Sequence, residues 1–279
     1  MSAELRGRGD KAGDRAAGRD RTVTDGALAD RTALVTGGTS GIGRAVVGHL
    51  SEVGLNVAFC GRSAERGAAV AAATGASFIA ADAADRADCD RSVDEAVAQL
   101  GGRLDLFVAC AATIFAAPLA ETPEHIFREL LEVNLTATFR YSRACLAVMR
   151  RQRSGVIVHV VSDAALRGIH HIPAYSVSKA GVLALSETLA AEAAAHGVRV
   201  NAICPGAVFP GMQTTAAGYE HHAEDASTWG PAPSGRHGTG RDVSNTVLWL
   251  ASDAAAHVSG ATLRLDGAAG VATRGVSCA

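Results

Sequence analysis

A glycine-rich turn between an apolar run and a helical pattern constrains this 279-residue chain more than any other feature. The turn reads Thr36-Gly37-Gly38-Thr39-Ser40-Gly41-Ile42-Gly43, with the apolar run 33–35 before it and the helical pattern 45–50 after it. Glycines let a backbone turn tightly and approach a ligand, and free N–H groups at a helix start attract a pyrophosphate. A purely structural turn is the alternative, because glycine is abundant and the spacing is wider than Gly-x-Gly-x-x-Gly. The order strand, turn and helix favours the start of a dinucleotide-binding sheet.

Further apolar runs alternate with amphipathic stretches along the rest of the chain. They occupy residues 57–59, 78–80, 104–108, 156–161, 198–203 and 262–265. Alternating strands and helices predict an α/β fold with a parallel sheet that is covered by helices on both faces. We expect seven strands in a single domain over residues 31–279, with ligands at the carboxyl ends of the strands.

The run Tyr175-Ser176-Val177-Ser178-Lys179 is the second informative motif. Lys179 is one of only two lysines in the chain, and the other, Lys11, lies in a polar leader. Positions i and i+4 share a helix face, so the phenol and the ammonium can point into one site. A nearby ammonium favours phenolate and lowers the pKa of a tyrosine from about 10. The pair therefore predicts a proton-transfer site, and a surface Tyr over a solvated Lys is the alternative.

With these two motifs in order, the chain resembles the short-chain dehydrogenase/reductase family, from about Arg31 to Ala268. Its marks are Thr-Gly-x-x-x-Gly-x-Gly near the start and Tyr-x-x-x-Lys past the middle. Further matches follow in order: Asn134, Ser162, Asn201 through Pro205-Gly206, and Asp266-Gly267. The resemblance implies a doubly wound Rossmann-type sheet with the strand order 3-2-1-4-5-6-7.

The resemblance also implies four catalytic residues. Tyr175 would protonate the carbonyl oxygen as hydride arrives from a nicotinamide, and Ser162 would hydrogen-bond that oxygen. Lys179 would hold the nicotinamide ribose and lower the pKa of Tyr175, while Asn134 would position a water that relays protons to Lys179. Taken singly, Ser162 could be a strand-end hydroxyl and Asn134 a helix-kink amide.

The end of the second strand bears on the choice of cofactor. An acidic residue about 20 positions after the glycines commonly binds the ribose 2′-hydroxyl of NAD. Gly61 and Arg62 follow Cys60 here, and an arginine can bind a 2′-phosphate through charge-assisted hydrogen bonds. We therefore expect NADP(H) to be preferred, with NAD(H) possible. Ser40 departs from this expectation, because many NADP-using relatives have a basic residue there, and Arg62 could instead be a solvated residue before the next helix.

Further cofactor contacts are carried over by position. They are Gly37, Thr39, Ser40, Gly41, Ile42 and Gly43 at the turn, Asp82 and Ala83 after the third strand, Cys110 and Ala111 after the fourth, Tyr175 and Lys179, and Pro205, Gly206 and Val208. Asp82 could instead be a turn residue.

Two departures from the family pattern affect these contacts. Ala109-Cys110-Ala111-Ala112 replaces the usual Asn-Asn-Ala-Gly, and Pro210 stands where relatives often carry a Thr that contacts the nicotinamide amide. We expect a slightly altered loop with retained cofactor binding, and the backbone of Val208 holding the carboxamide.

Substrate specificity is expected in a lid over residues 209–236, since loops of that length are usually lids or disordered. His170, His171 and Ile172, between Ser162 and Tyr175, are expected to face the same cavity. One of the two histidines is predicted to touch a polar substrate, and plain surface exposure is the alternative. Adjacent histidines lack the i, i+4 spacing of a chelating pair, so no metal site is predicted.

Composition narrows the remaining possibilities. A formal charge of −2 gives no sign of nucleic-acid binding, and no apolar run reaches the roughly 20 residues of a membrane span. Six scattered cysteines without a Cys-x-x-Cys pair suit free thiols in the cytoplasm. Residues 1–30 predict a disordered polar leader or a start codon assigned too early. The apolar stretches 126–149 and 175–195 predict a homotetramer or homodimer, and burial in the core is the alternative.

The combined prediction is an NADPH-dependent carbonyl reductase acting on a ketone or aldehyde of a small or medium polar substrate, in specialised biosynthesis. One alternative is an NAD(P)-dependent alcohol or sugar dehydrogenase that works oxidatively. Another is a non-catalytic dinucleotide sensor or scaffold, against which Ser162, Tyr175 and Lys179 argue.

Overall fold

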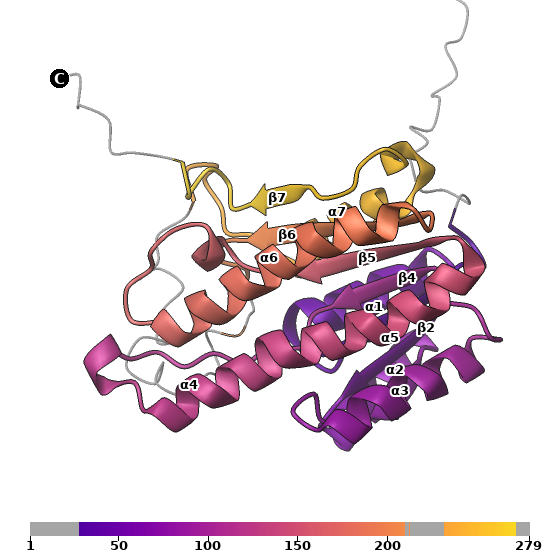
Figure 1. The fold of residues 1–279 in the computed structure, drawn as a ribbon, viewed down its shortest axis with the longest axis horizontal. Coiled ribbons are helices and arrows are strands. Elements are labelled where there is room, and N and C mark those ends of the chain that lie inside the picture. The colour runs from indigo at the N-terminus through magenta and orange to yellow at the C-terminus, as the bar shows by residue number, and fades with distance from the viewer. Residues whose placement is uncertain (1–27, 210–211, 213–231, 272–279) are drawn as a thin grey trace, which may run out of the picture.

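The computed structural model describes residues 28–209, 212 and 232–271 (Figure 1). Residues 1–27 of the predicted leader lie outside the described residues. The same holds for 210–211 and 213–231, which make up most of the predicted lid, and for 272–279.

Seven strands form one sheet in the order β3-β2-β1-β4-β5-β6-β7 (Figure 1). Every neighbouring pair is parallel. The strands are β1 (Thr32–Thr36), β2 (Asn56–Gly61), β3 (Ser77–Ala80), β4 (Leu106–Ala109), β5 (Gly155–Val160), β6 (Val198–Pro205) and β7 (Thr262–Leu265). The predicted fold class and strand order are confirmed.

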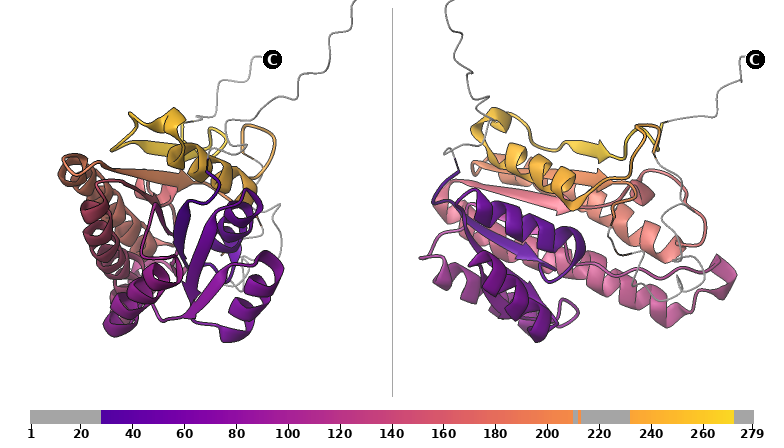
Figure 2. Two further views of the ribbon diagram at one scale, coloured as in Figure 1. Left: turned by 90° about the vertical axis from the view of Figure 1, so that its right-hand side faces the viewer. Right: turned by 180° about the vertical axis from the view of Figure 1, so that it is seen from behind.

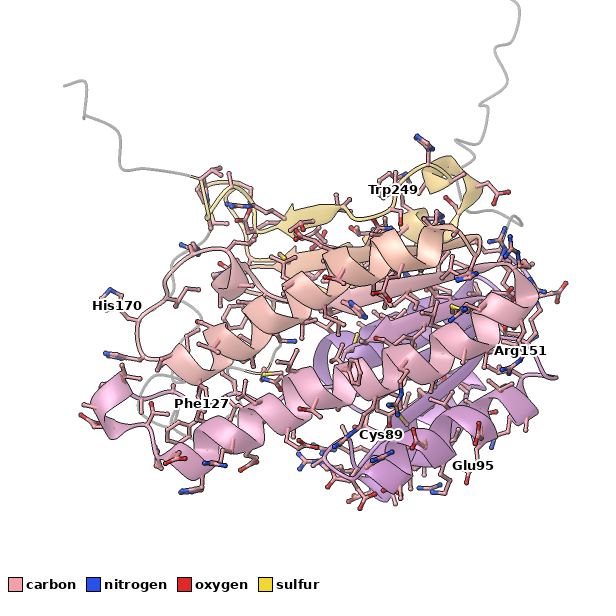
Figure 3. All side chains as sticks on the ribbon, in the orientation of Figure 1. Cys89, Glu95, Phe127, Arg151, His170 and Trp249 are labelled. Atoms are coloured by element: carbon pink, nitrogen blue, oxygen red, sulfur yellow. The ribbon has the colours of Figure 1, made fainter. Side chains whose placement is uncertain are left out.

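Helices cover both faces of the sheet (Figure 2). One face carries α1 (Gly41–Glu52), α2 (Ala64–Thr74) and α7 (Gly240–Ala251). The other carries α3 (Arg86–Gln99), α5 (Ala137–Gln152) and α6 (Pro173–Ala194). In Figure 3, Trp249 marks α7 and Cys89 marks α3. The remaining short elements are η1 (Leu119–Glu121), α4 (Glu124–Leu130), the π-helix η2 (Leu131–Thr136), η3 (Asp163–Ala165) and η6 (Asp253–Ala255).

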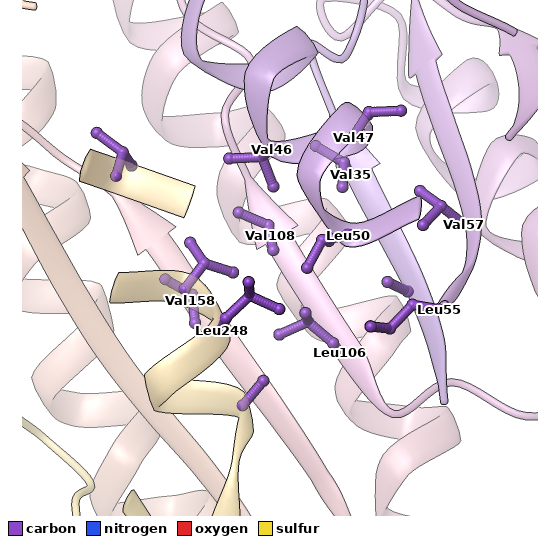
Figure 4. Packing of buried hydrophobic residues seen from close by; sticks show 14 of the residues in the cluster. Val35, Val46, Val47, Leu50, Leu55, Val57, Leu106, Val108, Val158 and Leu248 are labelled. Atoms are coloured by element: carbon purple, nitrogen blue, oxygen red, sulfur yellow. The ribbon is translucent and has the colours of Figure 1, made fainter. Parts of the chain in front are cut away.

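The core explains why the central strands read as continuous apolar runs. All five residues of β1 are buried, because successive side chains point to opposite, helix-covered faces. Val35 belongs to the same cluster as Val46 of α1 and Leu248 of α7 (Figure 4), whereas Leu34 packs into the cluster beneath α3 and α5. The sheet is therefore a rigid platform between two apolar layers.

The strand order reverses beside β1, since β2 lies on one side of it and β4 on the other. Crevices at such a switch point, outside the carboxyl ends of the strands, are where ligands bind in open α/β sheets. The glycine turn, Ser162 and Pro205 all lie at this edge, because they follow or end β1, β5 and β6. None of the helices in the described ranges is long and apolar enough to cross a bilayer.

Candidate active site

The glycine turn packs tightly on its inner side and is open on its outer side. Gly37 has φ 69°, and a Cβ there would lie 2.8 Å from the Cα of Ala111. Gly41 has φ 50°, and apart from its chain neighbours and its own helix backbone no described heavy atom lies within 4 Å of the position that its Cβ would take. The turn therefore needs glycine at Gly37 for close approach to the chain after β4, and at Gly41 for its left-handed backbone.

Helix α1 begins beside this open side. Ser40 occupies the N-cap position with an extended backbone, and its side chain makes no capping hydrogen bond in the described structure. The first turn of α1 contains no acidic residue either. N–H groups at such a helix start favour an anion, so these residues fit the pyrophosphate of a dinucleotide. Thr39 and Gly43 are buried, Ser40 and Gly41 exposed, and Ile42 half-buried.

Arg62 lies next to the same turn. The N–H of Gly38 donates to the carbonyl of Cys60 at 3.1 Å, which ties the glycine turn to the end of β2. Arg62 is exposed and directly precedes Ser63, whose hydroxyl caps α2 by accepting from the N–H of Arg66. The guanidinium is therefore accessible at the edge of the sheet where the predicted dinucleotide would lie.

Asp82 stabilises the turn after β3. Its Oδ1 accepts from the N–H of Ala84 at 3.0 Å, and its own N–H donates to Asp88 at 2.9 Å. The carbonyl of Ala83 accepts from the thiol of Cys89 at 3.3 Å. Asp82 thus acts as a turn residue, while its contact with the adenine ring of the cofactor stays a prediction.

Thr36 supports the turn after β4. Its Oγ1 accepts from the N–H groups of both Cys110 and Ala111, each at 3.2 Å. These bonds hold the backbone where the usual Asn side chains are missing. The sequence interpretation missed this residue, although Thr36 opens the glycine motif.

Tyr175 and Lys179 lie on one buried face of α6. Tyr175 is 9% and Lys179 3% exposed, and the Lys179 Nζ lies 5.8 Å from the centre of the Tyr175 ring. Nζ donates to the carbonyl of Val160 at 2.9 Å. Burial lowers the pKa of Lys179 to about 8, partly opposed by Cys110 and Cys204. The alternative of a surface Tyr over a solvated Lys is wrong.

Ser162 follows β5 and caps η3, where its Oγ accepts from the N–H of Ala164 at 3.2 Å. Its hydroxyl donates to Oδ1 of Asp163 at 3.3 Å. The other Asp163 oxygen accepts from Arg167, at 2.6 Å from Nη2 and 3.2 Å from Nε. The sequence interpretation did not include the Asp163–Arg167 ion pair. The spacing of four residues between an acid and an arginine is typical of such a pair.

Asn134 lies fully buried in the π-helix η2. Its Oδ1 accepts from the N–H of Thr113 at 2.7 Å, and its Nδ2 donates to the Thr113 carbonyl and to the Ser178 hydroxyl, both at 2.9 Å. Ser178 in turn donates to the carbonyl of Tyr175 at 2.7 Å. Asn134 therefore links the chain after β4 to α6, and its role with a relay water stays a prediction.

Gly206 and Val208 continue from β6 along the same edge. The N–H of Gly206 donates to Leu265 at 3.1 Å, and Val208 forms an isolated bridge with Gly238. Pro205, Gly206 and Val208 thus lie near the carboxyl end of β6 with their backbones held by neighbouring strands and loops, and their contact with the cofactor stays a prediction. Pro210 lies outside the described residues.

Other polar features lie elsewhere. His170 and His171 are both exposed, and Figure 3 shows His170 at the outer edge of the loop before α6. A surface groove of about 500 Å³ lies between α1, α2 and α7, away from Tyr175, and Glu52 and Arg241 line it. Within the described ranges, no group of three or more His, Cys, Asp or Glu side chains could hold a metal ion.

Comparison with known proteins gives consistent matches along nearly the whole described chain. The family model described as enoyl-(acyl carrier protein) reductase matches residues 37–269. The chain is 36% identical to 2,5-dichloro-2,5-cyclohexadiene-1,4-diol dehydrogenase of Sphingobium indicum, over 86% of this chain and 97% of that protein. The chain belongs to the short-chain dehydrogenase/reductase family.

Two other members of the short-chain dehydrogenase/reductase family illustrate its range. D-threitol dehydrogenase of Mycolicibacterium smegmatis is 35% identical, over 86% of this chain and 93% of that protein. The crystal structure of levodione reductase superposes with a TM-score of 0.79 at 28% identity, covering 88% of this chain and 99% of that one. Membership assigns the general activity of an oxidoreductase of alcohol and carbonyl groups that binds a nicotinamide dinucleotide.

Proposed function

We propose that this protein is an NADPH-dependent reductase that converts a ketone or aldehyde to an alcohol. The observation that carries the proposal is the accessible Arg62 at the end of β2, next to the glycine turn and without a carboxylate at position 61. A guanidinium there binds a 2′-phosphate, whereas a carboxylate would repel it. A high cellular ratio of NADPH to NADP would run the reaction toward the alcohol.

The catalytic roles proposed for the side chains follow from their positions. The Tyr175 hydroxyl donates the proton to the substrate oxygen, and the Ser162 hydroxyl turns from Asp163 to donate a hydrogen bond to the same oxygen. Donors preorganised toward developing negative charge usually make the largest contribution in such sites. Lys179 holds the nicotinamide ribose and favours phenolate at Tyr175, and Asn134 fixes the helix that carries both. Bound NADPH supplies the hydride.

Fluorescence titration with NADPH and with NADH tests the cofactor preference. We expect Arg62→Ala to weaken NADPH binding about 10- to 100-fold, because a charged hydrogen bond is worth about 1.5–3 kcal/mol, and to leave NADH binding unchanged. Arg66→Ala, an exposed arginine one turn further along α2, is the matched control and keeps NADPH binding. Tyr175→Phe also binds NADPH but lacks turnover, which separates an enzyme from a dinucleotide sensor or scaffold. Tighter NADH binding by the wild type would overturn the cofactor preference.

The second candidate is an NAD(P)-dependent alcohol or sugar dehydrogenase working oxidatively. The names of the two curated relatives favour it, because one is a cyclohexadiene-diol dehydrogenase and the other a threitol dehydrogenase. NADH preference together with faster alcohol oxidation than ketone reduction would support this candidate.

We further propose the setting of the enzyme. The catalytic domain begins at about residue 31. The protein acts in the cytoplasm, in specialised biosynthesis, as a homotetramer or homodimer formed through α5 and α6.

A further inference from the structure

A separate hydrophobic cluster surrounds Tyr175. Its buried members are Ile114, Leu130, Ala164, Ile172, Ala174 and Tyr175, and Phe115, Ala116, Ile126, Phe127, Ile169 and Met212 pack against it half-buried. The two larger clusters on the faces of the sheet contain none of these residues. A substrate whose oxygen reaches the Tyr175 hydroxyl must therefore lie against aliphatic and aromatic side chains.

The loop before α6 turns its apolar residues inward and its histidines outward. His171 adopts φ 66°, and its carbonyl accepts from the N–H of Ala117 at 2.7 Å. This bond joins the segment after β4 to the loop before α6. Ile172 is buried and Ile169 half-buried beside Tyr175, while both imidazoles are exposed. Contact of either histidine with a substrate stays a prediction.

The polar side chains that border the cluster already have partners. Both Asn134 side-chain atoms bond to Thr113 and Ser178. Oδ2 of Asp163 accepts from Arg167, which leaves only Oδ1 of this carboxylate open once the Ser162 hydroxyl turns to the substrate. Among the side chains that the structure describes around the cluster, substrate hydroxyls would find few open partners, and burying an unpaired polar group costs about 1–3 kcal/mol.

We infer that the substrate of this site is a ketone, or the matching secondary alcohol, with an apolar hydrocarbon skeleton and without further hydroxyl groups around the reacting carbon. The inference rests on the proposed function, since Tyr175 must be the proton donor. It replaces the polar substrate that the sequence predicted. The apolar surface stabilises the transition state through burial of the skeleton, and Ser162 and Tyr175 alone recognise the oxygen.

Initial-rate kinetics with NADPH and a set of ketones tests the inference. Cyclohexanone, 4-methylcyclohexanone and 4-ethylcyclohexanone serve as apolar probes, and erythrulose as the polyhydroxylated one. We expect kcat/KM to rise roughly three- to fourfold for each added methylene, from about 0.8 kcal/mol per buried group. Erythrulose is expected to be at least about tenfold poorer than 4-methylcyclohexanone, because each unpaired hydroxyl opposes binding.

Two variants test whether the hydrophobic cluster around Tyr175 causes the preference for apolar ketones. Phe115→Ser and Ile169→Ser are expected to lower the ratio of kcat/KM for 4-ethylcyclohexanone over erythrulose about tenfold, mainly through KM, because they remove apolar contacts worth about 1–3 kcal/mol. Val53→Ser is the matched control, a half-buried aliphatic residue at the end of α1, and keeps the ratio. NADPH binding is measured for each variant to verify folding.

The outcomes separate the two proposals. Preference for erythrulose, or an unchanged ratio in both cluster variants, overturns the inference and leaves the carbonyl reductase intact. Oxidation of the matching cyclohexanols in place of ketone reduction keeps the inference and overturns the proposed direction. No turnover of any probe in either direction, with NADPH or NADH bound, overturns the proposed function and the inference with it.

Discussion

Lys179 lies in a buried site that disfavours its positive charge. Its Nζ is buried beneath α6 and bonded to the Val160 carbonyl, and the groups facing it are Cys110 after β4, Cys204 on β6, His159 on β5 and Tyr175 on its own helix. Burial lowers the pKa of Lys179 from 10.5 to about 8, because a low-dielectric site disfavours the ammonium. The free protein therefore carries the ammonium at neutral pH and loses it as pH rises through about 8.

Loss of the Lys179 proton predicts that the activity of the enzyme falls at alkaline pH, which gives the pH profile an alkaline limb. We expect kcat/KM for NADPH to fall about tenfold for each pH unit above about 8, since kcat/KM reports the groups of the free enzyme and the ammonium holds the ribose. Stopped-flow or initial-rate kinetics over pH 6–10 measures the limb. Lys179→Arg stays protonated throughout this range, so its residual activity has no such limb. The same limb in both proteins would assign it to another group.

His159 joins three elements beneath the active site. The imidazole is fully buried on β5, with Nε2 at 2.8 Å from the Ser142 hydroxyl of α5 and Nδ1 at 2.6 Å from the Ser186 hydroxyl of α6. Ser186 gives its only proton to the Val182 carbonyl, so it accepts from Nδ1–H, and Ser142 donates to Nε2. The ring is therefore a neutral bridge that holds α5 and α6 against the sheet.

Removing this bridge is predicted to destabilise the fold. We expect His159→Val to lower the free energy of unfolding at pH 7.5 by about 1–3 kcal/mol, because the Ser142 hydroxyl loses its buried acceptor. Urea denaturation measures the change, and His257→Ala, at an exposed position, is the control with a change below about 0.5 kcal/mol.

Lowering the pH should reduce the difference in unfolding free energy between the wild type and His159→Val. Burial, with the charge of Lys179, lowers the pKa of His159 from 6.5 to about 3. Between these values the unfolded chain binds a proton that the folded chain does not, so the wild type loses stability as pH falls. The difference between wild type and His159→Val is expected to be about 2 kcal/mol smaller at pH 5. A difference that is unchanged or larger at pH 5 would contradict a neutral bridge.

The elements differ in how far the sequence predicted them. Local patterns specified the strands and the turn at Gly37, because periodicity and glycine act over a few residues. The Thr36 hydroxyl bonds and the His159 bridge depend on partners that are distant in sequence, so no local pattern indicated them. At Asn134 the sequence offered a helix kink as one alternative, and the structure has the π-helix η2 there. The orientation of His170 and His171 depends on the left-handed backbone of His171, which the sequence around it does not specify.

At the scale of the whole molecule, α5 and α6 leave apolar side chains uncovered. Phe139 on α5 is 47% exposed and Val177 on α6 is 51% exposed. Near these side chains α6 packs closely against η2, which leads into α5, since a Cβ at Gly181 would lie 2.7 Å from Leu135. The sequence indicated that these stretches are unusually apolar, but it did not specify which side chains the sheet would cover. The exposed ones form the surface through which we propose self-association.

Glutamate in place of Phe139 or Val177 is predicted to separate the subunits. We expect the wild type to have two or four times the 28.3 kDa chain mass and Phe139→Glu or Val177→Glu to have a single one, because an unpaired charge buried in an apolar interface costs several kcal/mol. Light scattering coupled to size-exclusion chromatography measures the mass. Leu119→Glu, at a 77% exposed residue of η1 outside these helices, is the control that keeps the assembly. A monomeric wild type, or glutamate variants with an undiminished mass, would exclude this surface as the interface.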